Sequence, residues 1–220
     1  MTTPSEVTSL SYAQACARLD MLMARESRTL LGLIGPPGAG KSTLAERFHA
    51  LHPDDSQIVP MDGFHLAQIE LQRLGRAGRK GAPDTFDSSG YVSLLKRLRD
   101  QAPDETVYAP MFRRDLEEPV AGAIPIFAAT KLLIAEGNYL ALDQGGWEHV
   151  APLLDEIWYV EVDATVRLER LLARHVQFGR PREAALAWVK VTDEPNARLI
   201  ESTASRVQFR VLPYEASAGG

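Results

Sequence analysis

The segment at residues 35–43 constrains the fold of this chain more than any other part of the sequence. It reads Gly-Pro-Pro-Gly-Ala-Gly-Lys-Ser-Thr and follows directly after an apolar run at residues 30–34. Residues 35–42 match G-x-x-x-x-G-K-[ST], a pattern in which backbone N–H groups wrap around phosphate oxygens. Glycines permit that close approach, and a helix that begins there turns its positive dipole end toward the phosphates. The segment therefore predicts a strand, a phosphate-binding loop and a helix at 41–51.

The same loop predicts a nucleoside triphosphate as the ligand. The Lys41 ammonium would lie on the β and γ phosphates, and the Ser42 hydroxyl would bind Mg²⁺. A Gly-rich turn without a ligand is the alternative interpretation. The residues predicted to contact the nucleotide are Gly35, Pro36, Pro37, Gly38, Ala39, Gly40, Lys41, Ser42 and Thr43.

Length and charge narrow the class of protein further. The 220 residues, of which 45% are apolar, suit one α/β domain with its own core. A net charge of −5 argues against a general nucleic-acid binder. Cys16 is the single cysteine, so an internal disulfide and a thiolate-rich zinc site are excluded. No signal peptide or membrane-length apolar run is recognisable, and we expect a cytoplasmic protein without a membrane partner.

Apolar runs alternate with amphipathic stretches along the chain, which is the rhythm of βαβ units in a parallel sheet. The continuous apolar run at 132–135 is typical of a central strand covered on both faces. Strands are predicted at 30–34, 57–60, 132–135, 156–162 and 207–212, with weaker candidates at 106–111 and 124–128. Helices are predicted at 12–24, 41–51, 66–74, 89–100, from the cap Asp163 to about 176, at 181–191 and at 196–203.

Asp62 is the first candidate for chemistry beyond nucleotide binding. It follows the predicted strand at 57–60, which should lie near the strand of the phosphate loop. Phosphoryl transfer to an alcohol needs a carboxylate close to the acceptor oxygen, and the carboxyl end of a strand places Asp62 in the crevice. An ordinary Asp-Gly turn is the alternative. His65 could bind acceptor hydroxyls or could be a packed or solvated histidine.

Glu136 is the second candidate. It ends the apolar run at 132–135 and fits the pattern of a hydrophobic strand followed by an acid that holds Mg²⁺ or its water shell. A solvated carboxylate at a strand end is the alternative. Asn138 and Tyr139 follow in the turn, where they could line an acceptor pocket or serve as a turn residue and a core aromatic.

Arginines form the third cluster. Arg167, Arg170 and Arg174 are spaced i, i+3, i+7 and share one helical face. Stacked like charges repel, so an anionic partner is plausible, and with Arg180 and Arg182 they could form a lid over the transferring phosphoryl group. A solvated helix face is the alternative.

A weaker basic cluster lies earlier in the chain. The loop at 73–80 is rich in arginine, lysine and glycine, and Arg113 and Arg114 come shortly after Tyr108. These residues could contact the acceptor, and their charge suggests that it carries a phosphate or a carboxylate. Solvated side chains are again the alternative.

Taken together, these motifs resemble those of the uridine kinase, pantothenate kinase and phosphoribulokinase superfamily. Within it, the chain looks like the bacterial branch labelled fructose transport system kinase-like or nucleoside kinase-like. The resemblance covers residues 25–212. It is carried by the loop at 35–43, Met-Asp-Gly-Phe-His at 61–65, Lys-Gly-Ala-Pro-Asp-Thr-Phe-Asp at 80–87, Glu-Gly-Asn-Tyr-Leu at 136–140, Arg-His at 174–175, and Asp193, Pro195 and Asn196.

The resemblance implies a three-layer P-loop fold with a doubly wound, mainly parallel sheet, helices on both faces and a small helical lid at about 167–192 in a single domain of residues 1–220. It implies ATP- and Mg²⁺-dependent phosphorylation of a small-molecule hydroxyl. We expect a monomer or a homodimer. Asp62 would be the base, and Glu136 a second metal-side carboxylate. Other roles implied by the resemblance are phosphate binding for Lys41, Mg²⁺ binding for Ser42, lid contacts for Arg170 and Arg174, and adenine contacts for Asn196 and Arg206.

A nucleotide-dependent switch or regulatory ATPase is the rival class, because hydrolysis can change shape without a phosphorylated acceptor. A GTPase switch should show Asn-Lys-x-Asp and Asp-x-x-Gly. The chain instead has Glu-Gly-Asn-Tyr after the run at 132–135. We therefore predict a small-molecule kinase.

Overall fold

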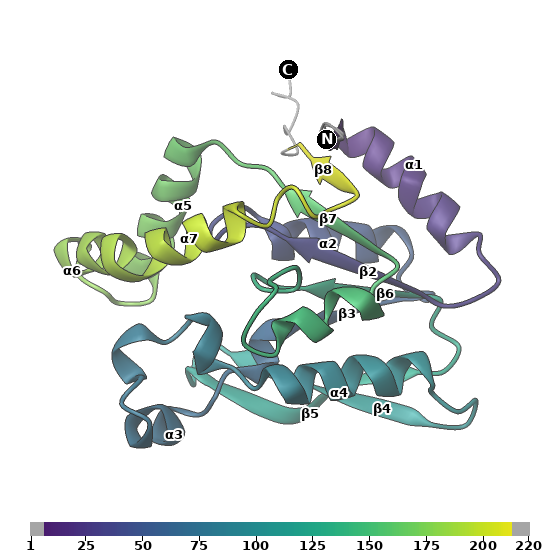
Figure 1. The fold of residues 1–220 in the computed structure, drawn as a ribbon, viewed down its shortest axis with the longest axis horizontal. Coiled ribbons are helices and arrows are strands. Elements are labelled where there is room, and N and C mark those ends of the chain that lie inside the picture. Colours follow the sequence, from purple (N-terminus) through teal and green to yellow (C-terminus); the bar gives the residue numbers. More distant parts are fainter. Residues whose placement is uncertain (1–6, 213–220) are drawn as a thin grey trace.

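The computed structural model of the protein describes residues 7–212, and a six-stranded parallel sheet forms its centre (Figure 1). The predicted span of 1–220 therefore includes two ends that lie outside the described residues. All five strand pairs of the sheet are parallel. In sheet order the strands are β1 (Thr8–Leu10), β8 (Phe209–Val211), β7 (Glu156–Val160), β2 (Thr29–Ile34), β6 (Leu132–Glu136) and β3 (Ser56–Pro60).

Helices cover both faces of this sheet, which confirms the predicted doubly wound α/β fold. On one face, α1 (Tyr12–Met23) and α2 (Lys41–Leu51) share a core cluster with β2, β6 and β7. On the other face, α4 (Ser88–Arg99) and α7 (Glu194–Glu201) belong to a larger cluster. Every residue of β2, β6 and β7 is buried, because apolar side chains on both sides of each strand find a covering layer.

The strand order brings three carboxyl ends together. The phosphate-loop strand β2 pairs with β6, and β6 pairs with β3, so one strand separates β2 from the strand that we expected to lie near it. Glu136 ends β6 in register with Leu33 on one side and Pro60 on the other. The residues that follow β2, β6 and β3 therefore meet at one edge of the sheet, where open α/β sheets bind their ligands.

A two-stranded antiparallel hairpin lies outside the main sheet. It consists of β4 (Thr106–Arg113) and β5 (Glu118–Phe127), which are longer than the strands predicted there. Its inward side chains, Val107, Ala109 and Ile126, are fully buried in the cluster that contains α4. Strand β1 was not predicted, since a three-residue strand with two exposed side chains carries little pattern.

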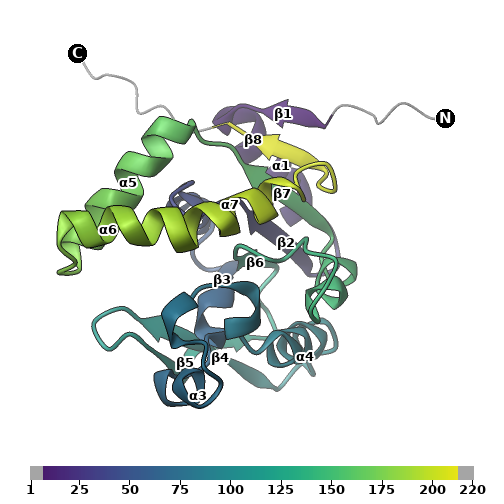
Figure 2. The same ribbon diagram turned by 60° about the vertical axis from the view of Figure 1, so that its left-hand side comes forward.

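The chain after β7 forms a helical arm. Figure 2 shows α5 (Ala164–Gln177), α6 (Arg182–Trp188) and α7 on one side of the molecule, across from the hairpin and α3 (Gln68–Arg73). Leu171, Leu172, Ala185 and Val189 form a small apolar cluster of their own within the arm. Asp163 caps α5, as predicted, by accepting from the N–H groups of Thr165 (2.8 Å) and Val166 (3.1 Å).

The two helices predicted at 181–191 and 196–203 are joined in the structure. A π-helix (Val189–Asp193) continues α6 into α7 without a loop. Pro195 lies in the first turn of α7 and has no N–H to donate, so the preceding backbone widens where an α-helical bond cannot form. The short 3₁₀ helices are Met61–Phe64, Ala77–Arg79, Pro83–Thr85, Trp147–His149 and Ala151–Leu153. Within residues 7–212, no helix is both long and apolar enough to cross a bilayer.

Candidate active site

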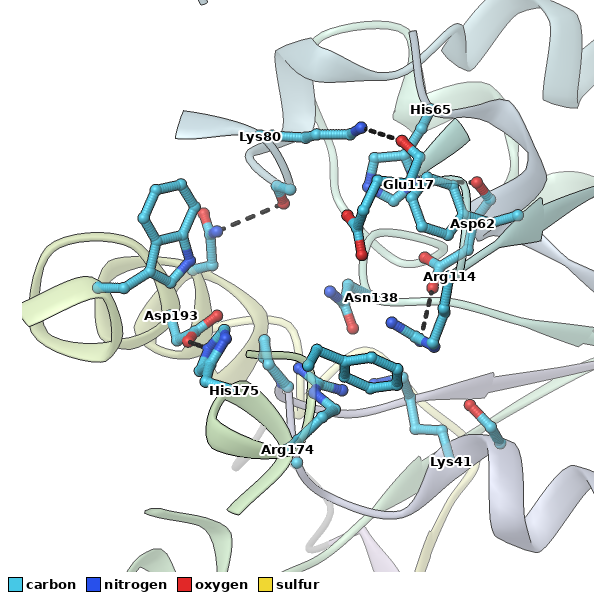
Figure 3. A pocket seen from close by; sticks show the side chains of 18 of the residues that line it. Lys41, Asp62, His65, Lys80, Arg114, Glu117, Asn138, Arg174, His175 and Asp193 are labelled. Carbon is cyan, nitrogen blue, oxygen red and sulfur yellow. Dashed lines mark hydrogen bonds and ion pairs between the residues drawn. The ribbon is translucent and has the colours of Figure 1, made fainter. Parts of the chain in front are cut away.

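A cavity of about 920 Å³ opens at the carboxyl ends of β2, β6 and β3 (Figure 3). Its walls come from the phosphate loop, the sheet edge, the loop at 77–81, the hairpin turn and the helical arm. The volume is typical of a pocket for a small-molecule ligand. Four residue types that phosphoryl transfer requires, a loop lysine, a serine hydroxyl, carboxylates and arginines, line this one space.

The phosphate loop has the backbone that its glycines predict. Gly38 and Gly40 have φ angles of +85° and +91°, in the left-handed region that side chains disfavour. A Cβ atom on Gly38 would also lie 2.9 Å from the carbonyl oxygen of Arg167. Gly40 is the N-cap of α2 and provides no side-chain acceptor, so the first N–H groups of that helix remain available to an anion.

Lys41 is buried at the base of the cavity. Its side chain is held by a hydrogen bond from Nζ to the carbonyl oxygen of Pro36 (3.3 Å). Burial lowers the pKa of Lys41, while the charges of Glu136 and Asp62 oppose that shift. A buried ammonium with few donors in use is suited to bind phosphate oxygens.

Glu136 has the most perturbed carboxylate in the site. Burial raises its pKa from 4.5 to about 7, and Asp62 adds to the rise, while Lys41 and a hydrogen bond from Ser42 oppose it. The Glu136 and Ser42 oxygens fit Mg²⁺, which prefers oxygen ligands and commonly uses one or two carboxylates with phosphates and water. No group of three or more His, Cys, Asp or Glu side chains that could hold a metal occurs within residues 7–212. The donor set therefore suits a cation that arrives with the nucleotide.

The raised pKa of Glu136 predicts a pH dependence of stability. Between pH 4.5 and about 7, folded Glu136 keeps a proton that the unfolded chain releases, so the free energy of unfolding falls as pH rises through this range. In Glu136→Gln, which has no proton to release here, the free energy of unfolding should fall by roughly 1 to 3 kcal/mol less over this range than in the original protein. Urea unfolding of both proteins without nucleotide, at about pH 5 and about pH 8, measures the difference. If the free energy of unfolding changed equally between the two pH values in both proteins, the raised pKa of Glu136 would be contradicted.

Asp62 lies in the 3₁₀ turn directly after β3 and faces the cavity. One of its carboxylate oxygens, Oδ2, lies 3.6 Å from Nη2 of Arg114, which extends from the hairpin turn. The side chain is 36% exposed, so an acceptor hydroxyl can reach it. The structure thus brings Asp62 to the same space as Lys41 and Glu136, as the sequence predicts.

The turn after Asp62 has no room for a side chain at Gly63. A Cβ atom there would lie 2.2 Å from the carbonyl oxygen of Pro110 on β4. We expect Gly63→Ala to push the hairpin away and to cost about 1 to 3 kcal/mol of the free energy of unfolding. Gly78→Ala is the matched control, because no heavy atom lies within 4 Å of its added Cβ. Denaturant unfolding of both variants tests this, and equal losses would contradict it.

His65 lies beside Asp62 against two aromatic rings. Its Nδ1 lies 2.8 Å from the carbonyl oxygen of Asp62, and its ring centroid is 4.0 Å from that of Phe86 and 4.7 Å from that of Phe112. Burial lowers the pKa of His65, with the charges of Lys80 and Arg114 contributing in the same direction. A neutral imidazole that donates from Nδ1 leaves Nε2 free to accept a hydrogen bond from a hydroxyl.

Most of the other predicted residues also face the cavity. Arg174 is half-buried, and this burial lowers its pKa. Arg167 is different, since it does not line the cavity and pairs with Glu194 within the helical arm. The cavity-lining residues that the sequence singled out beyond the loop are Asp62, His65, Arg114, Glu136, Asn138, Arg170, Arg174 and Asn196.

Within the phosphate loop, Gly35, Pro36 and Ala39 do not line the cavity. Four further predicted contact residues, beyond the loop, also lie outside it. Tyr108 projects from β4 and is 56% exposed. Arg113 pairs with Asp115 (2.7 Å) within the hairpin turn. Tyr139 is a buried core aromatic whose hydroxyl donates to the carbonyl oxygen of Gly81. Arg206, predicted to contact adenine, pairs with Asp143 (2.6 Å) on the surface.

Several cavity residues had no predicted role. His175 Nε2 lies 2.8 Å from Oδ2 of Asp193, a pair that joins α5 to the π-helix. Glu117 sits at the hairpin turn with a φ of +54°, an uncommon conformation for a residue other than glycine, and extends into the cavity in Figure 3. Trp188 carries a stacked arginine, Arg180. The Arg-His and Asp193 positions belong to the sequence motifs, whereas nothing in the sequence marks Glu117 or Trp188.

Known proteins that resemble this chain in sequence are named as kinases. The chain is 35% identical over 181 residues to the "putative uridine kinase" of Schizosaccharomyces pombe, covering 77% of this chain and 75% of the relative. It is 37% identical over 145 residues to an ATP-dependent kinase-like protein of Aspergillus versicolor, covering 62% and 84%. No family model matches the chain.

A solved structure shows the same fold. The crystal structure of a "putative fructose transport system kinase" from Silicibacter sp. TM1040 is 33% identical to this chain and superposes with a TM-score of 0.82. The match covers 91% of this chain and 98% of that structure. The chain therefore belongs to the uridine kinase-like superfamily of P-loop kinases.

Proposed function

We propose that this protein is an ATP- and Mg²⁺-dependent kinase that transfers the γ-phosphoryl group to a hydroxyl of a small metabolite. The observation that carries the proposal is that Asp62 faces the same cavity as Lys41 and the phosphate loop. A nucleotide-binding site alone needs no carboxylate at that place. A kinase needs one, because the acceptor hydroxyl must lose its proton.

Each residue has a defined part in the proposed reaction. The loop N–H groups and Lys41 bind the phosphates, and Ser42 and Glu136 would hold Mg²⁺, which neutralises charge on the phosphate oxygens. Asp62 accepts the proton of the acceptor hydroxyl as the oxygen of that hydroxyl bonds to the γ-phosphorus. The bond between that phosphorus and the β–γ bridging oxygen breaks, and ADP leaves. Arg170 and Arg174 line the same cavity as the base and would stabilise the spreading negative charge.

An acceptor-dependence assay tests the proposal. ADP release from Mg·ATP is measured across a panel of sugars, sugar phosphates, hydroxy acids, nucleosides and pantothenate. We expect at least one compound to stimulate release, and the phosphorylated product to appear in equal amount. ADP release that no compound stimulates would instead support a regulatory ATPase.

A further inference from the structure

Four cations line the cavity outside the phosphate loop and form no ion pair within the part of the chain that the structure describes: Lys80, Arg170, Arg174 and Arg180. The proposed function assigns Arg170 and Arg174 to the transferring phosphoryl group, which leaves Lys80, before Gly81, and Arg180, just after α5. The neighbouring basic residues differ. Arg73 pairs with Glu70, Arg76 and Arg79 pair with Asp84, and Arg113 pairs with Asp115. Of the charged residues in the basic loop at 73–80, Lys80 is therefore the one that lines the cavity.

Lys80 is held in place by its surroundings. Its Nζ donates to the carbonyl oxygen of Glu117 and lies 5.2 Å from the centroid of the Phe112 ring. The next carbonyl group, that of Gly81, accepts from the Tyr139 hydroxyl and from Asn196 Nδ2 (3.4 Å). An ammonium has three donors, so two of them remain for a ligand. The side chain is also half-buried, which strengthens its interaction with an anion.

Arg180 offers a second set of free donors from the helical arm. Its guanidinium lies 4.1 Å from the centroid of the Trp188 ring. Stacking fixes the plane of the guanidinium but leaves its N–H groups pointing outward from the ring. Nη1 is buried and has no hydrogen-bond partner among residues 7–212. A buried donor without an acceptor is costly, so a ligand that supplies anionic oxygens would relieve that cost.

Lys80 lies on the acceptor side of the cavity. Figure 3 shows it on the wall opposite Lys41 and Arg174, which serve the phosphates in the proposed function. Its charge acts on His65, which contacts the carbonyl of Asp62. An anion at Lys80 is therefore separated from the γ-phosphoryl group by the residues that surround the reacting hydroxyl.

We infer that the acceptor carries an anionic group, a carboxylate or a phosphate monoester, that binds to Lys80 and Arg180. This inference rests on the proposed function and names its substrate class. Glu117 extends into the space beside Lys80 and would accept hydrogen bonds from hydroxyls of the same molecule. A hydroxylated acid or a sugar phosphate combines these features.

Binding measurements test the inference without relying on turnover. The protein is saturated with Mg²⁺ and the non-hydrolysable β,γ-imido analogue of ATP. It is then titrated calorimetrically with matched pairs: glycerate against glycerol, pantothenate against panthenol, and fructose 6-phosphate against fructose. The pairs distinguish carboxylate from phosphate. Lys80→Met and Arg180→Met are compared with Arg79→Met, whose side chain pairs with Asp84 outside the cavity.

We expect at least one anionic compound to bind at least tenfold more tightly than its neutral partner. Lys80→Met and Arg180→Met should each weaken that compound by about 10- to 100-fold, the value of a charge-assisted hydrogen bond, while Arg79→Met should not. Neutral partners that bind equally well, failure of every anionic compound to bind, or indifference to both substitutions would overturn the inference. An anion that binds through Lys80 but is never phosphorylated would overturn the proposed function alone.

Discussion

Replacing Asp62 with asparagine is expected to lower kcat by about 100-fold or more while the affinity for Mg·ATP changes little. Asparagine keeps the size and polarity of the side chain, but its amide cannot take the proton of the acceptor hydroxyl. The loss therefore falls on the step in which the acceptor oxygen bonds to phosphorus. Steady-state kinetics with the acceptor found in the panel, together with calorimetric binding of the ATP analogue, separates the two quantities.

Asp115→Asn is the matched control for this substitution. Asp115 is another exposed aspartate, paired with Arg113 in the hairpin turn, and it does not line the cavity. Both substitutions remove an ion pair between exposed side chains, so both should alter the free energy of unfolding by less than about 1 kcal/mol. A kcat for Asp62→Asn within a few-fold of the original value would remove Asp62 from the role of base.

Replacing Lys41 with methionine is expected to impair both binding and turnover. Methionine keeps much of the length of the side chain but removes the ammonium that would lie on the β and γ phosphates. We expect kcat to fall by about 100- to 1,000-fold, as for the loss of one preorganised charge at a transition state. The affinity for Mg·ATP should fall as well, whereas it should change little in Asp62→Asn. Calorimetry with the ATP analogue measures this affinity.

The Lys41→Met substitution should not lower the free energy of unfolding of the protein without nucleotide. Lys41 is buried, and burial is what lowers its pKa, so its charge costs free energy in the folded state without nucleotide. Lys131→Met is the control, because Lys131 is exposed and its Nζ lies 3.6 Å from an oxygen of Asp55 away from the cavity. Unchanged ATP affinity in Lys41→Met would contradict the phosphate-binding role.

The parts of this site that lie close to a regular element were predictable. Gly38, Gly40 and Lys41 belong to one loop whose shape follows from glycine and from the start of a helix. Asp62 and Glu136 each end a strand, and parallel strands direct their carboxyl ends to one edge. Local sequence therefore placed these residues correctly although β6 separates β2 from β3.

The sequence could not predict where side chains in turns and in the hairpin would lie. Arg113 and Arg114 are adjacent in the sequence, yet Arg113 pairs within the turn and Arg114 reaches Asp62. Tyr139 follows the same strand as Glu136 but is buried by the core beneath Gly81. Which partner a charged side chain meets depends on how the turns and the neighbouring segments fold, and the pattern of residues alone carries no information about that.

The sequence by itself determined the phosphate loop, the parallel α/β sheet and the two strand-end carboxylates, because glycine conformation, hydrophobic periodicity and strand polarity are local properties. Only the tertiary structure decided which of the many basic residues face the cavity. Asp84 pairs with Arg76 and Arg79 nearby in the chain, and the distant Asp143 pairs with Arg206. The packing of the hairpin and the helical arm leaves Lys80 and Arg180 without such partners among the described residues. The charge that a ligand meets is set by these pairings and by how the hairpin and the arm pack in three dimensions.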